Sequence, residues 1–336
     1  MSIVLAGDIG GTKTLLALYR ASDELLEPLC SRRYNSEEWP DLAPMVQAFL
    51  GEARDTAAPD DRPAAACFAV AGPVQQGAAR LTNLPWQLEE RQLSDAIGIA
   101  PVELVNDFAV LVYGLHHLGS AQQASIRQGT ACEGEPVLIL GAGTGLGVAF
   151  GVPGPAGLTA VASEAAHAEF APRNPAEWQL KQWLAEDLGI QRVSVERVVS
   201  GTGLGHVARW LLSERHPDGE HPLHQCNGDL PAAVTSAAAL GDPLAREALD
   251  LWLEAYGSVT GDLALTALCR GGIWLAGGTA GKLLMELRSP QFRRAFLDKG
   301  RLGAVLEPLP ITAVTDSASG EFSAACRARM LLQTAS

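Results

Sequence analysis

An asparagine and an aspartate follow directly after residues 102–105, Val-Glu-Leu-Val, which we predict to be a short strand. Active sites of open α/β sheets gather at the carboxyl ends of strands. Asp107 in that place can accept the proton of an attacking hydroxyl group, while Asn106 orients the hydroxyl by hydrogen bonding. Aspartate is also a favoured N-cap for a following helix, and position alone leaves both roles open.

Two glycine-rich turns are candidates for phosphate binding. Residues 7–12 and 141–147 each lie between apolar runs that are typical of strands. Successive glycines let backbone N–H groups turn toward an anion, and Asp8 at the end of the first strand can hold a hydrated divalent cation beside the phosphates. One glycine pair alone would more simply be a hairpin turn, but the chain contains this arrangement twice.

The second turn differs from the two common nucleotide-binding fingerprints. Position 146 is leucine where the dinucleotide fingerprint needs glycine, and no Gly-Lys-Ser or Gly-Lys-Thr ends the turn as in a P-loop. A third motif places Gly277 and Gly278 after the apolar run 273–276. Glycines there would let a flat adenosine group lie against the backbone, although a tight β–α turn would also use them.

Three more polar side chains suit recognition of a polyol. Glu164 and His167 are three residues apart and would face the same way on a helical turn, and Glu196 follows in the next polar segment. A di-iron site would need a second Glu-x-x-His, which the chain lacks. A solvated surface is the simpler alternative for all three. The histidines of residues 214–229 are more typical of a surface loop than of a metal site.

Composition restricts the class of protein. The 336 residues are 47% hydrophobic and 19% charged, and 38 acidic against 25 basic residues give a formal net charge of −13. This charge has the wrong sign for a nucleic-acid binder. No basic leader and no apolar stretch of about 20 residues is present, so we expect no membrane segment. The six scattered cysteines predict reduced thiols and a cytoplasmic protein.

The predicted elements that position these residues form one pattern twice. In the first part, strands at 3–6, 15–19 and 29–34 precede a helix at 41–53, a strand at 65–70, a helix at 87–97 and the strand at 102–105. In the second part, strands at 137–140, 148–152 and 158–162 precede helices at 175–188, 193–199 and 243–268 and the strand at 273–276. The repeat predicts two α/β domains with a cleft between them.

Taken together, these motifs resemble the bacterial glucokinase family, within the superfamily of hexokinases, actin and heat-shock ATPases. The resemblance covers nearly the whole chain. Residues 7–12 and 141–147 look like the two phosphate motifs, 81–86 like the Thr-Asn-x-x-Trp stretch near the sugar, and 105–108 like the catalytic Asn-Asp. Residues 195–201 are similar to the sugar-binding Glu segment and 273–278 to the adenosine motif.

The resemblance implies an α/β fold of two ribonuclease-H-like domains and ATP-dependent phosphorylation of glucose at its 6-hydroxyl, with Mg²⁺. It implies a small domain of residues 1–116 and 317–336 and a large domain of residues 117–316. Asp107 would be the base, and Asp8 would hold Mg²⁺ through water. The implied sugar ligands are Asn83, Asn106, Asp107, Glu164, His167 and Glu196. The implied nucleotide ligands are Gly7, Asp8, Ile9, Gly10, Gly11, Thr12, Gly141, Gly143, Thr144, Gly145, Gly277 and Gly278.

Two departures from the family pattern bear on specificity. Ala165 and Ala166 stand where the family often has Gly-Gly, so another hexose such as fructose or mannose is the alternative substrate. Lys13-Thr14 is similar to the related ROK sugar kinases, which usually carry a zinc-binding cysteine cluster. No cysteine lies between Cys132 and Cys226, so the resemblance favours the zinc-free glucokinases. Family precedent predicts a homodimer without nucleic-acid or membrane partners.

Overall fold

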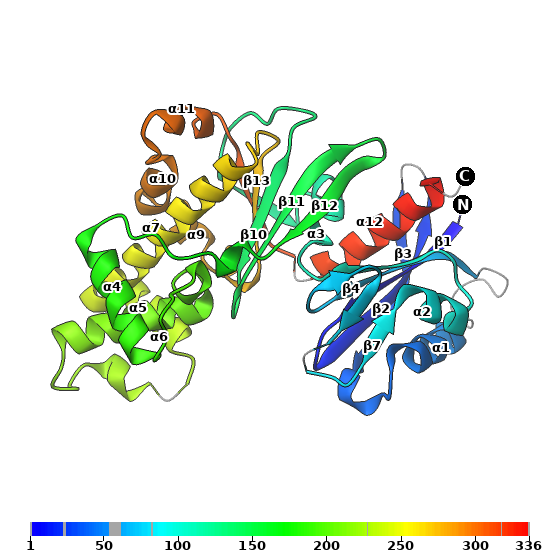
Figure 1. Cartoon of the computed structure of the whole chain (residues 1–336), viewed down its shortest axis with the longest axis horizontal. Helices are drawn as coiled ribbons and strands as arrows, with labels where there is room; N and C mark the ends of the chain where they lie inside the picture. Colours follow the sequence, from blue (N-terminus) through cyan, green and yellow to red (C-terminus); the bar gives the residue numbers. More distant parts are fainter. Residues whose placement is uncertain are drawn as a thin grey trace. The chain divides into compact units, whose positions relative to one another are not determined.

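The structure is a computed structural model that describes residues 2–22, 25–53, 62–81, 83–226, 228–316 and 318–334 (Figure 1). The chain divides into two compact units. The first comprises Met1–Gln122, Gly151–Ala162 and Asp316–Ser336, and the second comprises Gln123–Phe150 and Ser163–Thr315. This division places Gly151–Ala162 in the first unit, whereas the boundaries expected from the sequence leave that segment in the second domain.

The first unit is built on a five-stranded sheet in the order β3-β2-β1-β4-β8. The first three strands are antiparallel neighbours and the last two run parallel to β1. Their bounds are β1 Ser2–Ile9, β2 Lys13–Ala21, β3 Leu26–Asn35, β4 Pro63–Val70 and β8 Val102–Asn106. A small antiparallel sheet contains β5 Val74–Gln75, β6 Ala78–Arg80 and β7 Gln87–Glu89.

Helices cover both faces of this sheet (Figure 1). Ile3 and Leu5 of β1 share a core with Met45 and Phe49 of α1 (Leu42–Ala53). On the other face α12 (Ser319–Thr334) packs against β1 and β4. The alternation of side chains along β1 therefore turns Asp8, an even-numbered position, toward the α12 face. Two further helices are α2 Glu90–Ile97 and α3 Leu111–Gly114.

The second unit repeats the plan in a six-stranded sheet, β12-β11-β10-β13-β14-β9. As in the first unit, three strands that are consecutive in the chain lie side by side, and the next strand, β13, pairs in parallel with the first of them, β10. The bounds are β9 Gln123–Arg127, β10 Val137–Ala142, β11 Leu146–Gly154, β12 Gly157–Ser163, β13 Ile273–Ala276 and β14 Ile311–Val314.

The helices of the second unit share one large apolar core. They are α4 Pro175–Asp187, α5 Gly201–Arg215, α6 Leu230–Ala239, α7 Pro243–Thr266, α8 Gly278–Lys282, α9 Leu284–Leu287, α10 Pro290–Leu297 and α11 Gly303–Leu306. None of the helices in the described ranges is long and apolar enough to cross a membrane.

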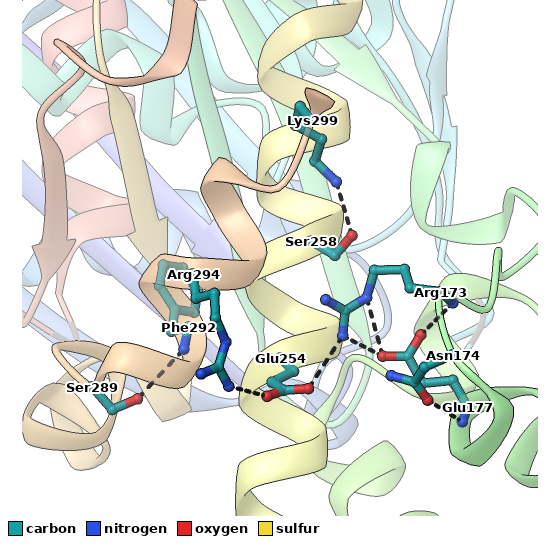
Figure 2. Close-up of polar contacts among 9 residues, drawn as sticks. All are labelled: Arg173, Asn174, Glu177, Glu254, Ser258, Ser289, Phe292, Arg294 and Lys299. Carbon is teal, nitrogen blue, oxygen red and sulfur yellow. Dashed lines mark hydrogen bonds and ion pairs between the residues drawn. The ribbon is translucent and has the colours of Figure 1, made fainter. Parts of the chain in front are cut away.

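Polar contacts tie three of these helices together (Figure 2). Arg173 precedes α4 and donates through Nε to Glu177 at 3.1 Å, and its guanidinium lies 3.6 Å from Glu254 on α7. Glu254 in turn pairs with Arg294 on α10 at 2.7 Å. The Glu177 side chain is only 2% exposed, and Arg173 supplies the ion-pair partner that a buried carboxylate needs.

Two predicted helices are wrong in part. The predicted helix at 87–97 begins with strand β7, because residues 87–89 pair with β6, and only Glu90–Ile97 is helical. The predicted helix at 193–199 contains only the 3₁₀ turn Val195–Arg197, and Ser200 then caps α5. Thus a helix does follow this segment, but it starts at Gly201. Three closely spaced glycines, which are poor helix formers, kept this start from being predicted.

Candidate active site

In the first unit, Asp8 and Asp107 lie at the same end of the sheet, where its parallel strands end. In the parallel register Ile9 lies opposite Val70, and Val70 lies opposite Asn106, so β1, β4 and β8 end side by side. Asp107 N–H extends the ladder by donating to the Val70 carbonyl at 2.9 Å. The two carboxylates thus lie at the carboxyl ends of parallel strands, where the sequence predicted them to be.

Asn106 takes the capping role that was open for Asp107. Its Oδ1 accepts from the backbone N–H groups of Phe108 at 3.1 Å and Ala109 at 3.0 Å. Its Nδ2 donates to the Gly72 carbonyl at 3.0 Å and to Asp107 Oδ1 at 3.1 Å. Asn106 therefore fixes the turn after β8 and also orients the Asp107 carboxylate, which remains open to solvent.

Asp107 has the protonation behaviour of a general base. Partial removal from water, followed by the negative charge of Asp8, raises the pKa of Asp107 to about 6. The hydrogen bond from Asn106 opposes this rise. A carboxylate with a pKa near neutrality is ionised at pH 7 and still binds a proton strongly enough to take it from a hydroxyl group.

Asp8 is suited to a divalent cation. Burial raises the pKa of Asp8, and the negative charge of Asp8 raises the pKa of Asp107, so a cation at Asp8 would stabilise the ionised form of both carboxylates. Carboxylate oxygens are the ligands that Mg²⁺ prefers, and Mg²⁺ commonly keeps its water shell between itself and one or two carboxylates. The donor chemistry and the local charge at Asp8 both fit a hydrated Mg²⁺.

The first glycine turn is tight and lies against a predicted sugar residue. Gly10 N–H donates to the Lys13 carbonyl at 3.0 Å, which closes the turn between β1 and β2. A Cβ built on Gly11 would lie 2.8 Å from Cβ of Asn83, so Gly11 lets Asn83 approach. Thr12 at the tip of the turn is exposed.

Gly7 and Ile9 serve the core of the first unit. A Cβ on Gly7 would collide with the Phe68 ring at 2.6 Å, and Ile9 is fully buried in the sheet core. Both residues are paired with β2 on one side and with β4 on the other, so they contribute to the sheet and to the packing beneath it.

The second glycine turn joins β10 to β11 and is held by the start of α5. Gly143 N–H donates to the Gly145 carbonyl at 2.8 Å. Gly201 N–H donates to the Gly143 carbonyl at 2.7 Å, and the Thr202 hydroxyl donates to the Thr144 carbonyl at 2.8 Å. The turn and the N-terminus of α5 are therefore one hydrogen-bonded unit. Helix N-termini favour anions.

The third glycine motif lies beside the second. Gly141 of β10 is opposite Ala276 of β13, and Gly277 follows with φ 81°. A Cβ on Gly277 would lie 2.9 Å from the Ala142 carbonyl oxygen, so both conformation and space require glycine there. Gly278 and Gly143 have open space above them instead, with no atom within 4 Å of an added Cβ.

A cavity of about 780 Å³ adjoins these motifs within the second unit. Its volume suits a ligand of nucleotide size. Three predicted nucleotide residues, Gly143, Thr144 and Gly278, line it. Other lining residues were not predicted from the sequence. They come from α5, α6, α7 and the α8 region and include Gly201, Thr202, His206, Arg209, Pro231, Trp252, Thr279 and Lys282. The Ser200-Gly201-Thr202 sequence, a hydroxyl cap before a helix, was the available signal.

The predicted polyol residues of the second unit lie on two neighbouring turns. Glu164 precedes the 3₁₀ turn Ala165–His167, and His167 is the last residue of that turn. His167 Nε2 lies 3.6 Å from Glu164 Oε2, and both side chains are exposed. Ala168 and Phe170 exchange backbone hydrogen bonds with Val195 and Val193 at 2.9 Å, which holds the Glu164 segment to the Glu196 turn. Glu196 Oε2 accepts from Leu146 N–H at 3.0 Å.

No group of three or more His, Cys, Asp or Glu side chains in the described ranges is arranged to hold a metal ion. In the histidine-containing loop, His221 Nδ1 accepts from Leu223 N–H at 3.2 Å, and its Nε2 lies 3.2 Å from Asp242, the cap of α7. Both ring nitrogens of His221 thus contact neighbouring protein groups and hold the loop in place.

Comparison with known proteins agrees with this geometry. The family model described as Glucokinase matches residues 5–331. A glucokinase of Synechocystis sp. is 42% identical over 96% of this chain and 96% of its own length, and that of Nostoc punctiforme is 39% identical over 98% and 100%. A crystal structure of a glucokinase from an Antarctic psychrotroph is 27% identical, with a TM-score of 0.83 over 98% of this chain and 99% of that one.

These matches cover both units, and the predicted fold class, two α/β domains of the actin-like type, is confirmed. The resemblance stated from the motifs is confirmed as well, because the family model and the curated relatives extend over nearly the whole sequence. This chain belongs to the glucokinase family.

Proposed function

We propose that this protein is an ATP-dependent glucokinase that converts glucose and ATP into glucose 6-phosphate and ADP. The observation that carries the proposal is that Asp8 and Asp107 lie at the carboxyl ends of β1 and β8, on either side of β4, where the charge of Asp8 acts on Asp107. We assign Asp107 as the base and Asp8 as the cation ligand. Membership of the glucokinase family supports the choice of glucose and ATP.

In the proposed reaction Asp107 accepts the proton of the sugar 6-hydroxyl as the oxygen attacks the γ-phosphorus. The bond between that phosphorus and the β–γ bridging oxygen breaks, and ADP leaves. Asn106 keeps the base oriented through its 3.1 Å hydrogen bond. When bound, Mg²⁺ neutralises the charge on the phosphates, and Asp8 would hold it through water. Phosphoryl transfer needs chiefly alignment and charge neutralisation, which these residues can supply.

The remaining residues are proposed ligands. The phosphates are assigned to the two glycine turns within residues 7–12 and 141–145, where N–H groups that donate to no protein atom would bind the phosphate oxygens. Gly277 and Gly278 would accommodate the adenosine. The 780 Å³ cavity beside Gly143 and Gly278 supports the adenosine assignment. Sugar hydroxyls other than the 6-hydroxyl are assigned to the side chains of Asn83, Glu164, His167 and Glu196. The side chain of Asn106 is left out of this set, because its two donor hydrogens and its acceptor oxygen already serve four contacts within the protein.

A panel of hexoses tests the proposal. ADP release is coupled to an absorbance change and measured with glucose, mannose and fructose at equal concentrations. We expect kcat/KM to be highest for glucose. A higher value for fructose or mannose would replace glucose by the alternative hexose, for which Ala165 and Ala166 in place of Gly-Gly are the specific reason. ADP release that no sugar stimulates would overturn the kinase assignment.

We also propose a homodimer that works without zinc. Both follow from the resemblance to zinc-free glucokinases. Sedimentation velocity should give about twice the mass of the 35.3 kDa chain. Activity in the presence of Mg²⁺ should survive a zinc chelator, and loss of activity would show that zinc is needed.

A further inference from the structure

Glu196 connects the proposed sugar ligands of the second unit to its glycine turn. One carboxylate oxygen, Oε2, accepts from Leu146 N–H at 3.0 Å, across 50 residues of sequence. A Cβ on Gly145 would collide with the same oxygen, so the carboxylate lies directly over the turn. In the described part of the chain the other oxygen, Oε1, makes no hydrogen bond.

This contact fixes the orientation of one peptide group. The peptide between Gly145 and Leu146 offers a carbonyl on one side and an N–H on the other. Gly143 N–H satisfies the carbonyl at 2.8 Å, and Glu196 satisfies the N–H. Within the described ranges the N–H groups of Thr144 and Gly145 donate to no protein atom, so a turn of this shape leaves them for an anion.

The bond to Glu196 differs from the other contacts that hold the turn. Gly201 and Thr202 both donate to carbonyl groups of the turn, at 2.7 and 2.8 Å. Glu196 instead accepts from a backbone N–H, that of Leu146, with a carboxylate oxygen, and a hydrogen bond to a carboxylate is the stronger kind. The Ser200 hydroxyl, which caps α5, donates to the Glu196 carbonyl at 2.7 Å and fixes the backbone that carries Glu196.

We propose that Glu196 is a positioning residue for the nucleotide: one carboxylate oxygen shapes the phosphate-binding turn while the other binds a sugar hydroxyl, so that each substrate strengthens the binding of the other. The inference rests on the proposed function, which places sugar at Glu196 and phosphate at the turn. A bound sugar orders the carboxylate, and an ordered carboxylate holds the turn ready for phosphate. Coupling of this kind is reciprocal.

Calorimetric titration with Mg²⁺ and a non-hydrolysable ATP analogue, with no sugar present, tests the first half. Glu196→Ala should raise the dissociation constant of the analogue about tenfold, the usual effect of losing a hydrogen bond to a charged group. Glu196→Gln keeps an oxygen that can accept from Leu146 N–H and should stay within about threefold of the unchanged protein. Glu164→Ala is the matched control, because Glu164 is a proposed sugar ligand with no contact to the turn, and it should leave analogue binding unchanged.

Gly145→Ala provides an independent variant that keeps the carboxylate. Gly145 has no left-handed φ, so alanine fits the backbone, but its Cβ would push Glu196 away from Leu146. We expect the same loss of analogue affinity as in Glu196→Ala, and no further loss in the double variant, because both changes break one interaction. Adding glucose should tighten analogue binding in the unchanged protein and in Glu196→Gln, and this effect should disappear in Glu196→Ala.

The outcomes separate the inference from the function on which it rests. If Glu196→Ala binds the analogue as the unchanged protein does, or if Glu164→Ala weakens it equally, Glu196 does not position the turn, although the kinase assignment stands. If the unchanged protein binds no analogue under any condition, both the proposed function and the inference are wrong.

Discussion

At the scale of single residues, the Asp107 side chain does not provide the cap of the turn after β8. The turn after β8 needs a cap, and Asn106 supplies it through two hydrogen bonds to the backbone. The Asp107 carboxylate accepts a hydrogen bond from the Asn106 side chain, and the charge of Asp8 raises its pKa. It therefore remains available as a proton acceptor. A substitution at Asp107 should consequently affect chemistry much more than folding.

Asp107→Asn should lower kcat by about 10²- to 10⁴-fold or more, with little change in the KM for glucose, because the amide cannot take the proton. Steady-state rates with Mg²⁺-ATP measure this effect. In the unchanged protein, activity should fall as the pH drops below about 6, since protonated Asp107 is no base. Asp95→Asn, which removes an exposed acid on α2, is the matched control. Near-normal turnover in Asp107→Asn would mean that another group is the base.

Glu321 is a second unusual carboxyl group, and its role concerns stability. Its side chain on α12 is 4% exposed and accepts a hydrogen bond from Tyr19. Among the residues that the structure describes, its other oxygen, Oε1, has no hydrogen-bond partner. Burial, followed by the charges of Asp8 and Asp316, raises the pKa of Glu321 to about 7, although the bond from Tyr19 opposes the rise. The folded protein thus binds a proton at Glu321 more tightly than the unfolded chain does.

This linkage predicts a pH-dependent effect of Glu321→Gln. Wild-type Glu321 contributes stability that is fully present below its unfolded pKa of about 4.5 and is lost as the pH rises through about 7. Glutamine keeps an acceptor for Tyr19 without the charge, so the variant should be more stable than wild type at pH 8, by on the order of 1 kcal/mol or more, and similar at pH 4.5. Urea unfolding at both pH values measures the difference. If Glu321→Gln were less stable than wild type at pH 8, ionised Glu321 would not destabilise the folded protein as expected.

At the scale of elements, the glycines of the three motifs divide into those that the fold needs and those that leave space unfilled by the protein. Gly7 and Gly277 accommodate protein atoms, because an added Cβ would collide with Phe68 or with the Ala142 carbonyl. Gly143 accommodates no protein atom, yet it lines the 780 Å³ cavity. The open space at Gly143 is therefore part of the cavity and is available to a ligand.

Gly143→Val should therefore fold normally and raise the KM for ATP by about tenfold or more, because its side chain would occupy the place where we propose that a phosphate approaches. The KM for glucose should change much less. Gly51→Val, at an exposed position of α1 that also has open space, is the control and should alter neither constant. An unchanged KM for ATP in Gly143→Val would remove this turn from the nucleotide site.

Elements with regular patterns were predictable from the sequence, and those made by tertiary contact were not. Apolar spacing located α1 and β13 within a residue, and paired glycines located both turns. In contrast, α5 begins with Gly201, Gly203 and Gly205, residues that are poor helix formers, and it forms because α5 packs on the turn and on α7. The contact of Glu196 with Leu146 joins residues 50 positions apart, and no local pattern records it. The roles assigned to the site residues and the domain boundaries stay predictions.

At the scale of the whole molecule, each compact unit has a core of its own. One buried cluster contains residues of the first unit only and the other contains residues of the second unit only. A structure with two separate cores is expected to depart from two-state unfolding, because one core can be lost while the other persists. Two substitutions can identify which transition belongs to which unit.

Scanning calorimetry at pH 8 should accordingly resolve unfolding into two transitions, with a calorimetric enthalpy larger than the van't Hoff enthalpy. Glu321→Gln should raise only the transition of the first unit. Arg173→Ala should lower only the other, since it leaves the buried Glu177 carboxylate without its guanidinium partner (Figure 2). The expected cost of that loss is on the order of 2 kcal/mol, less than for a fully buried pair, because Arg173 is partly exposed and its backbone N–H still donates to Glu177. A single transition that both substitutions move would show that the two cores unfold together.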